Sequence, residues 1–177
     1  MQLYLFGCPM NPMNADLELA AFAAVHHLRA AGLSVATAES CTGGLIAAAI
    51  TGVPGASAVF RYGWVTYCNE AKERELGVLP SVIEQYGVVS EPVVAAMAQG
   101  AMRCAGADLA LAVSGNAGPT AADGEPAVGT VCLALARRGA ARPVHTETIF
   151  RPELPRNALR AYVAARALHL LAASAQA

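Results

Sequence analysis

The segment "DLALAVSG", residues 108–115, constrains the fold most, because it is apolar at nearly every position. A strand buried on both faces of a sheet reads as a continuous apolar run, whereas a half-exposed strand alternates apolar and polar residues. Such a strand needs a covering layer above and below it. The segment therefore predicts a central strand of a sheet that lies between two layers of helices.

Strands and helices alternate along most of the chain. The patterns predict strands at 33–40, 60–68, 108–115, 130–138 and 144–150, and helices at 14–31, 43–51, 69–76, 81–87, 90–105 and 156–173. Asn14, Asn69 and Ser90 are the expected N-caps. A chain of 177 residues fits one core but not two ordinary domains. We predict an α/β fold, a three-layer α/β/α sandwich around one mixed sheet, as a single domain over 14–177 after an N-terminal extension of residues 1–13.

The charge and the cysteine content of the chain indicate which partners and which cellular compartment to expect. The net charge is −1, and the densest basic run, 136–142, is typical of a solvated turn, so we expect no nucleic-acid partner. Five scattered cysteines without a CxxC spacing indicate free thiols in a reducing compartment rather than disulfides or a zinc site. No signal peptide or membrane span is predicted, so we expect a cytoplasmic protein. Only 14% of residues are charged, which favours a homodimer or larger homo-oligomer.

The motif "ESCTGG", residues 39–44, stands where a strand ends and a helix begins. A hydroxyl at Ser40 could attack a carbonyl there, while the N–H groups of Thr42, Gly43 and Gly44 hold the developing oxyanion. Alternatively, Ser40 or Thr42 only caps the helix. The two glycines would also suit a phosphate cradle, although neither GxxxxGKS/T nor GxGxxG is present. The motif alone leaves these interpretations open.

A serine nucleophile needs a base, and the four histidines do not supply one. They lie within helices or a late strand, without an acidic partner near a strand end, so no Ser-His-Asp triad is indicated. The remaining candidate is Lys72, the only lysine, which is the third helical residue if Asn69 is the cap. The positive end of the helix dipole, together with burial, would lower its pKa. Alternatively, Lys72 is solvated and pairs with a neighbouring glutamate. Tyr67, at the end of the preceding strand, could relay a proton or orient Ser40.

Several segments together carry a family resemblance. They are "TAESCTGGLIAAAITGVPGAS", "YGWVTYCNEAKERELGV", "YGVVSEPVVAAMAQGA", "ADLALAVSGNAGP" and "AVGTVCLAL". In this order, over residues 14–172, the chain resembles the CinA C-terminal domain of the competence/damage-inducible proteins. That family includes nicotinamide mononucleotide amidohydrolases of the PncC type. The resemblance implies a three-layer α/β/α domain and an amidase without metal or cofactor. The implied reaction converts nicotinamide mononucleotide, a pyridine mononucleotide, into nicotinic acid mononucleotide and ammonia.

The resemblance also assigns roles to the residues of the two motifs. Ser40 in "ESCTGG" matches the family's nucleophile, Lys72 in "NEAK" its base, and Tyr67 the tyrosine that precedes the lysine. In this scheme Lys72 is neutral at rest, removes the proton of Ser40 and later returns it to the leaving ammonia, after which water hydrolyses the acyl-enzyme. Cys41, beside the nucleophile, is expected to be a bystander, because free cysteines are usually packing residues.

Two regions depart from the family pattern. Arg156 and Arg160 in "LPRNALR" are similar to the arginines of the family's "GDRxxVR" segment and would bind the substrate phosphate, although "ELPR" replaces "GDR"; the alternative is solvated arginines. The loop "SGNAGPTAADGEPAVGTV" replaces "TGIAGPGGG…KPVGTV", so Ser114, Gly115 and Asn116 would line an altered substrate pocket. The altered loop motivates a second hypothesis, a catalytically silent relative that binds a nucleotide or a partner protein through the same pocket.

Overall fold

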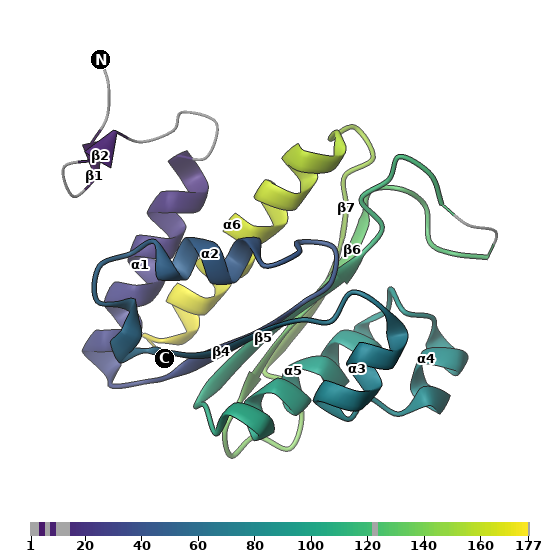
Figure 1. The fold of residues 1–177 in the computed structure, drawn as a ribbon, viewed down its shortest axis with the longest axis horizontal. Coiled ribbons are helices and arrows are strands. Elements are labelled where there is room, and N and C mark those ends of the chain that lie inside the picture. Colours follow the sequence, from purple (N-terminus) through teal and green to yellow (C-terminus); the bar gives the residue numbers. More distant parts are fainter. Residues whose placement is uncertain (1–3, 6–7, 10–14, 122–123, 177) are drawn as a thin grey trace.

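The computed structural model describes residues 4–5, 8–9, 15–121 and 124–176 (Figure 1). The strands are β1 (Tyr4–Leu5), β2 (Cys8–Pro9), β3 (Val35–Glu39), β4 (Phe60–Val65), β5 (Leu109–Gly115), β6 (Thr130–Arg137) and β7 (His145–Phe150). The helices are α1 (Ala15–Ala31), α2 (Leu45–Thr51), α3 (Asn69–Leu76), α4 (Pro80–Tyr86), α5 (Glu91–Ala105) and α6 (Arg156–Ser174), with a 3-10 turn at Ala56–Ala58.

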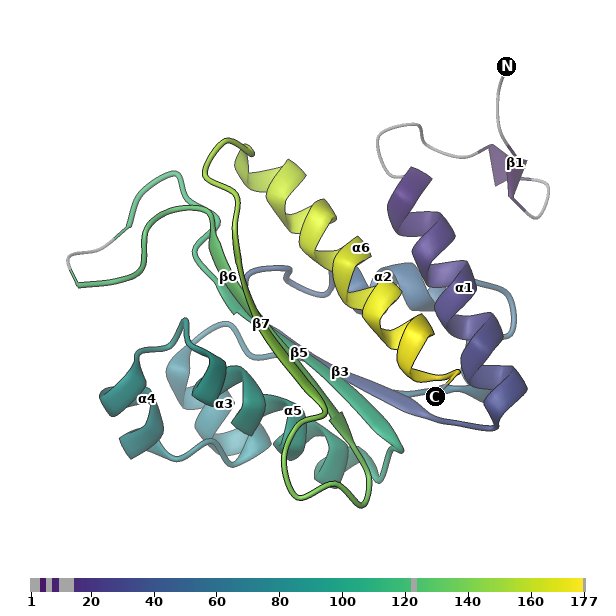
Figure 2. The same cartoon turned by 180° about the vertical axis from the view of Figure 1, so that it is seen from behind.

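One mixed five-stranded sheet organises the domain, in the order β4-β3-β5-β6-β7. Strand β3 runs parallel to β4 and β5, whereas β6 is antiparallel to both β5 and β7. Helices α1, α2 and α6 cover one face and α3, α4 and α5 the other, as the two opposite views show (Figures 1 and 2). The predicted three-layer α/β/α architecture around a mixed sheet is confirmed.

The central strand β5 is buried on both faces, as its apolar run predicted. Its larger side chains enter the core shared with α1, α2 and α6, namely Leu109, Leu111 and Val113. Its alternate residues, Ala110 and Ala112, enter the second core beneath α5. Successive side chains of a strand point to opposite faces, so each face of β5 carries one size of residue. The alanine face lets the helices of the second layer pack close to the sheet.

Helix α5 in turn supports the end of α3 at close range. A Cβ atom built at Gly100 of α5 would lie 2.0 Å from the carbonyl oxygen of Leu76, the last residue of α3. Real Cβ atoms do not approach a backbone oxygen so closely, so this crossing requires glycine. The position of α3 matters for the site, because α3 carries Lys72.

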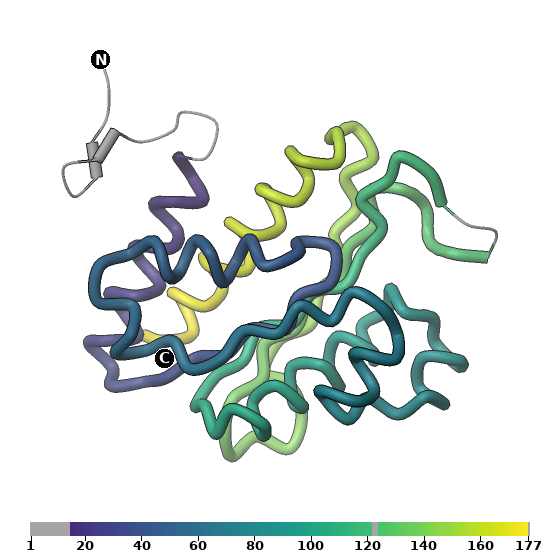
Figure 3. Tube along the Cα trace, in the orientation of Figure 1, coloured from purple at the N-terminus to yellow at the C-terminus, as the bar shows by residue number. Residues whose placement is uncertain are grey.

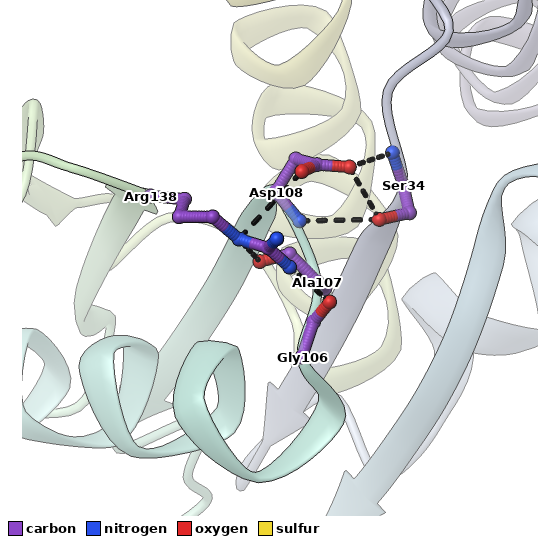
Figure 4. Close-up of polar contacts among 5 residues, drawn as sticks. All are labelled: Ser34, Gly106, Ala107, Asp108 and Arg138. Atoms are coloured by element: carbon purple, nitrogen blue, oxygen red, sulfur yellow. Dashed lines mark hydrogen bonds and ion pairs between the residues drawn. The ribbon is translucent and has the colours of Figure 1, made fainter.

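A polar cluster joins the amino ends of β3 and β5 (Figure 4). The Asp108 carboxylate accepts hydrogen bonds from the Ser34 backbone N–H (2.8 Å) and hydroxyl (2.6 Å), and the Ser34 Oγ accepts one from the Asp108 N–H (3.1 Å). These bonds lower the pKa of Asp108, the bond from the Ser34 hydroxyl most. Arg138 lies 3.7 Å from the Asp108 carboxylate and also donates to the carbonyls of Gly106 and Ala107. The cluster holds the two strands in register at the end opposite Ser40.

Some predicted boundaries need correction. Asn69 is the first residue of α3 rather than its cap, which is Cys68, so Lys72 is the fourth helical residue instead of the third. Ser90 is the N-cap of α5, as predicted, while Asn14 lies outside the described residues.

Strand β4 ends at Val65, so Tyr67 follows the strand rather than ending it. Within the predicted extension 1–13, β1 and β2 pair antiparallel; the other residues there lie outside the described part.

Candidate active site

Ser40 is the first residue after β3, in the turn that leads into α2. Figure 3 shows the path of the chain through the sheet and the helices around it. Its backbone N–H donates to the carbonyl of Val113 on β5 at 2.9 Å, which continues the parallel ladder by one residue. Gly43 and Gly44 then adopt the left-handed conformation, with φ of 62° and 91°. That region suits glycine because other residues place a Cβ against the backbone there. The turn is therefore sharp, and Ser40 is fixed at the edge of the sheet.

Lys72 lies next to Ser40, although 32 residues separate them in the sequence. The Nζ atom of Lys72 is 3.4 Å from the Oγ atom of Ser40. Its other neighbours are two backbone carbonyl oxygens, that of Thr66 at 2.8 Å and that of Cys68 at 3.4 Å. The Lys72 side chain is 0% exposed. The alternative of a solvated lysine paired with a glutamate is therefore wrong.

The surroundings of Lys72 favour its neutral form. Desolvation lowers the pKa of Lys72, against weaker opposing effects of Cys68, Cys41 and Glu70. A neutral amine has two N–H donors and one lone pair, and the two carbonyl oxygens can only accept. In the neutral form, the two N–H groups can serve Thr66 and Cys68, which leaves the lone pair for the hydroxyl of Ser40. This is the arrangement that a general base for Ser40 requires.

The start of α2 is capped by Glu39, a residue that the motif analysis did not single out. Its carboxylate is 1% exposed and accepts hydrogen bonds from the N–H groups of Gly44 (3.0 Å), Ile46 (3.1 Å) and Ala47 (2.8 Å). A carboxylate is well placed at a helix N-terminus because it satisfies unpaired N–H groups and complements the helix dipole. The hydroxyl groups of Ser40 and Thr42 form no such cap, so the capping interpretation of the motif is wrong.

The N–H groups of the turn only partly match the predicted oxyanion donors. The N–H of Gly43 donates to the carbonyl of Ser40 at 3.0 Å, and that of Gly44 donates to Glu39. Since both are occupied, the prediction is wrong for these two glycines as oxyanion donors. Among the hydrogen bonds between described residues, the N–H groups of Cys41 and Thr42 donate to no other residue. The residue directly after the nucleophile therefore joins Thr42 as a candidate.

A cavity of about 360 Å³ opens beside Ser40. Most of the predicted site residues line it together, from the turn after β3, the turn before α3, the end of β5, the loop after β5 and the start of α6. The lining residues include Ser40, Cys41, Tyr67, Asn69, Ser114, Gly115, Asn116, Thr120, Glu125 and Arg156. Lys72 is not among these lining residues. Sequence reasoning missed Asn69 and Glu125, although both stand in segments that it had singled out.

The side chains of two predicted pocket residues are hydrogen-bonded to the backbone of neighbouring loops. The Oγ atom of Ser114 donates to the carbonyl of Val88 at 2.8 Å. The amide of Asn116 donates to the carbonyl of Pro126 (3.2 Å) and accepts from the N–H of Gly118 (2.9 Å). With these two bonds, Asn116 joins Gly118 and Pro126 of the same loop.

The two predicted phosphate ligands lie in different places. Arg156, the first residue of α6, lines the cavity; it donates to the carbonyl of Gly118 at 2.5 Å and to the hydroxyl of Tyr67 at 3.1 Å. Tyr67 is 61% exposed and meets Arg156 rather than Ser40. Arg160 is outside the cavity lining and donates to the carbonyl of Cys41, in the turn that carries Ser40. Only Arg156 is thus presented to a ligand in the cavity.

The thiol of Cys41 behaves as expected for a bystander. Burial raises its pKa to about 12, and this outweighs the opposing effects of the hydrogen bond from its own backbone N–H and of Arg160. Cys41, Cys68, Cys104 and Cys132 are free thiols, as predicted for these four.

No group of three or more His, Cys, Asp or Glu among the described residues could hold a metal ion. No helix in that part of the chain is both long and apolar enough to cross a bilayer.

The fold and site define an α/β sandwich domain with a buried serine–lysine pair at the carboxyl edge of its sheet. Residues 18–175 match the family model of the CinA C-terminal domain, so the chain belongs to this family. A CinA-like protein of Akkermansia muciniphila is 54% identical over 159 residues, which cover 90% of this chain and 37% of that protein. The chain thus spans little more than a third of that relative's length.

A shorter relative carries a functional name. The nicotinamide-nucleotide amidohydrolase PncC of Enterobacter agglomerans is 56% identical over 109 residues, which cover 62% of this chain and 66% of that protein. Among solved structures, the competence/damage-inducible protein CihA of Agrobacterium tumefaciens aligns with a TM-score of 0.87 and 36% identity over 95% of this chain and 100% of that one. The fold is therefore shared with the CihA protein, and the sequence is similar to that of the PncC relative.

Proposed function

We propose that this chain is an amidohydrolase that converts nicotinamide mononucleotide into nicotinic acid mononucleotide and ammonia, within pyridine nucleotide salvage and without a metal or cofactor. The observation that carries the proposal is the 3.4 Å contact between Ser40 Oγ and a buried Lys72 whose pKa is lowered. The name of the PncC relative supports the choice of a nicotinamide nucleotide as substrate.

The proposed mechanism uses Ser40 as nucleophile and Lys72 as base and acid. The neutral amine of Lys72 takes the hydroxyl proton as Oγ attacks the carboxamide carbon. The resulting ammonium returns this proton to the amide nitrogen, the C–N bond breaks, and ammonia leaves an ester on Ser40. Lys72, neutral again, then removes a proton from the water that attacks the ester, and it returns this proton to Oγ of Ser40 as the C–O bond of the ester breaks and the acid is released. The carbonyls of Thr66 and Cys68 keep the amine aimed at Ser40 throughout.

Arg156 is the proposed phosphate ligand. Its guanidinium lines the cavity at the amino end of a 19-residue helix, where a cation and the helix dipole both favour an anion. The hydroxyl of Tyr67, 3.1 Å from Arg156, is the second polar group on that side. Since Arg160 is bound to the turn, it is not part of this phosphate site. We expect Arg156→Ala to raise KM for the mononucleotide more than it lowers kcat.

Ammonia release from nicotinamide mononucleotide tests the proposal. We expect release by the wild-type protein, and losses of at least about a hundredfold in Ser40→Ala and Lys72→Met, since general-base catalysis contributes that much or more. Ser90→Ala is a matched control, because Ser90 makes only an exposed bond to the carbonyl of Gly87. Undiminished release by Ser40→Ala or by Lys72→Met would refute the roles assigned here.

The second candidate function is binding of a nucleotide or a partner protein without catalysis. The observation that favours it is the altered loop, in which Asn116 is committed to Pro126 and Gly118 rather than to a ligand. Calorimetric titration with nicotinamide mononucleotide distinguishes the two functions. Binding without ammonia release supports the silent relative, whereas binding with release supports the amidohydrolase.

A further inference from the structure

Arg160 holds the turn that carries Ser40, a role that the mechanism above does not use. Its Nε atom donates to the carbonyl of Cys41 at 3.0 Å, and its Nη2 atom donates to the carbonyl of Thr42 at 2.8 Å. The third nitrogen, Nη1, donates to the side chain of Asn157 at 3.1 Å. Every nitrogen of the guanidinium thus has an acceptor within the protein, and two of the three lie in the turn.

These bonds fix the direction of the neighbouring N–H groups. In a planar trans peptide the carbonyl and the following N–H point in opposite directions. Because the carbonyl of Cys41 points to Arg160, the N–H of Thr42 points away from it. The carbonyl of Thr42 also points to Arg160, so the N–H of Gly43 in the same peptide group points away from it. This N–H of Gly43 donates to the carbonyl of Ser40 at 3.0 Å. That bond in turn directs the N–H of Cys41 away from Gly43.

Glu39 stabilises the same turn in a second way, because its carboxylate accepts hydrogen bonds from N–H groups at the start of α2. Arg160 thus holds carbonyl groups and Glu39 holds N–H groups. Within residues 40–44, the N–H groups of Cys41 and Thr42 are the ones that donate to no other described residue. Cys41 also lines the cavity. Oriented N–H groups beside a nucleophile are the usual means of stabilising an oxyanion, and the residue after the nucleophile is a common donor.

We propose that Arg160 is a positioning residue, which fixes the turn so that the N–H groups of Cys41 and Thr42 receive the oxyanion formed at Ser40. Arg160 then acts through the backbone and does not bind the substrate phosphate. This role rests on the proposed amidohydrolase function. It separates the two arginines of "LPRNALR", since Arg156 contacts the ligand and Arg160 shapes the site.

Steady-state kinetics distinguish positioning from phosphate binding. For Arg160→Ala we expect kcat to fall roughly a hundredfold, as for loss of one oxyanion donor. We expect KM to change by less than about threefold, because ground-state binding is retained. The loss in kcat is expected to be equal with nicotinamide riboside, which lacks the phosphate. Arg160→Lys is expected to recover activity only in part, since one ammonium cannot span both carbonyls.

Arg166→Ala is the matched control on the same helix. Arg166 also makes a two-armed contact, to the Glu147 carboxylate at 2.8 and 2.7 Å, but it lies away from the turn. We expect its kcat to stay at the wild-type value. A loss in Arg160→Ala that appears only in KM for the phosphorylated substrate, with kcat intact, overturns the proposal and restores the phosphate role.

Amide hydrogen exchange tests the hold on the turn without any turnover. We expect faster exchange at Gly43 and Gly44 in Arg160→Ala than in the wild type, and no change there in Arg166→Ala. Unchanged exchange in Arg160→Ala overturns the proposal. If Arg160→Ala does not fold, the steady-state kinetics and the hydrogen exchange are both measured on Arg160→Lys instead. A wild-type protein that is inactive on the mononucleotide refutes the proposed function, whereas the exchange measurement still decides whether Arg160 holds the turn.

Discussion

Replacement of Glu39 by glutamine removes one charge from a buried carboxylate and leaves the shape of the side chain almost unchanged. In the wild type, Oε2 accepts from Gly44 (3.0 Å) and Ile46 (3.1 Å), and Oε1 accepts from Ala47 (2.8 Å). Glutamine has one oxygen, which can keep the first two bonds. Its NH₂ group then faces the N–H of Ala47, and both are donors. The substitution therefore leaves at least one buried N–H without a partner.

The cost can be worked out bond by bond. An unsatisfied buried N–H costs about 1–3 kcal/mol, and the two remaining bonds each lose the part of their strength that came from the charge, about 0.5–1 kcal/mol. The sum is about 2–5 kcal/mol. For a chain of this size, each kcal/mol shifts Tm by about 2–4 °C, so we expect a decrease of about 4–20 °C by calorimetry at pH 7.

Glu91→Gln is the matched control. Glu91 also accepts two hydrogen bonds, from the hydroxyl groups of Thr146 (2.8 Å) and Thr148 (2.9 Å), but at an exposed site. Hydroxyl groups can rotate to accept from the new NH₂ group, so the expected cost is below about 1 kcal/mol. A Tm for Glu39→Gln within about 2 °C of the wild-type value would refute the capping role, because the three N–H groups would then have been satisfied in another way.

Three further predictions concern the site and its support. We expect kcat/KM to rise with pH through a midpoint below 10.5, because the pKa of Lys72 is lowered from that value. The native state then binds fewer protons than the unfolded state, so the free energy of unfolding rises with pH between the lowered pKa and 10.5, and Lys72→Met removes this slope in denaturant titrations. Cys41→Ala is expected to keep kcat in the ammonia assay, since a thiol with a pKa of about 12 is not the nucleophile; loss of the reaction would contradict this. Gly100→Ala is expected to cost about 1–3 kcal/mol and to lower kcat, because its Cβ would lie 2.0 Å from the oxygen of Leu76 and displace α3; an unchanged Tm would argue against this close crossing.

The layer architecture could be predicted from the sequence because it follows from local patterns. The continuous apolar run of β5 and its alternation of large residues with alanine encode a strand with a different helix layer on each face. Residue type left Lys72 as the candidate base, as the chain has one lysine and no suitable histidine, and the family resemblance paired it with Ser40. Their 3.4 Å distance could not be predicted, since it depends on how β3 and α3 meet at the edge of the sheet.

The errors have physical causes that local sequence does not reveal. Asn69 is a typical N-cap residue, but the carbonyl of Cys68 accepts from the Lys72 N–H at 3.4 Å, so the helix begins one residue earlier. Glu39 was overlooked because a carboxylate at a strand end is usually solvated, and only the fold shows three N–H groups converging on it. Arg160 contacts a carbonyl 118 residues away in the chain, which no local pattern encodes.

Acid-quenched intact-mass analysis during turnover of nicotinamide mononucleotide tests the central claim most directly, because the proposed mechanism places an ester on Ser40. We expect a covalent adduct with the mass of the acyl nucleotide, mapped by peptide analysis to Ser40 and absent from both Ser40→Ala and Lys72→Met. Ammonia release that proceeds in Ser40→Ala at the wild-type rate, or an adduct mapped to another side chain, would contradict the serine–lysine mechanism.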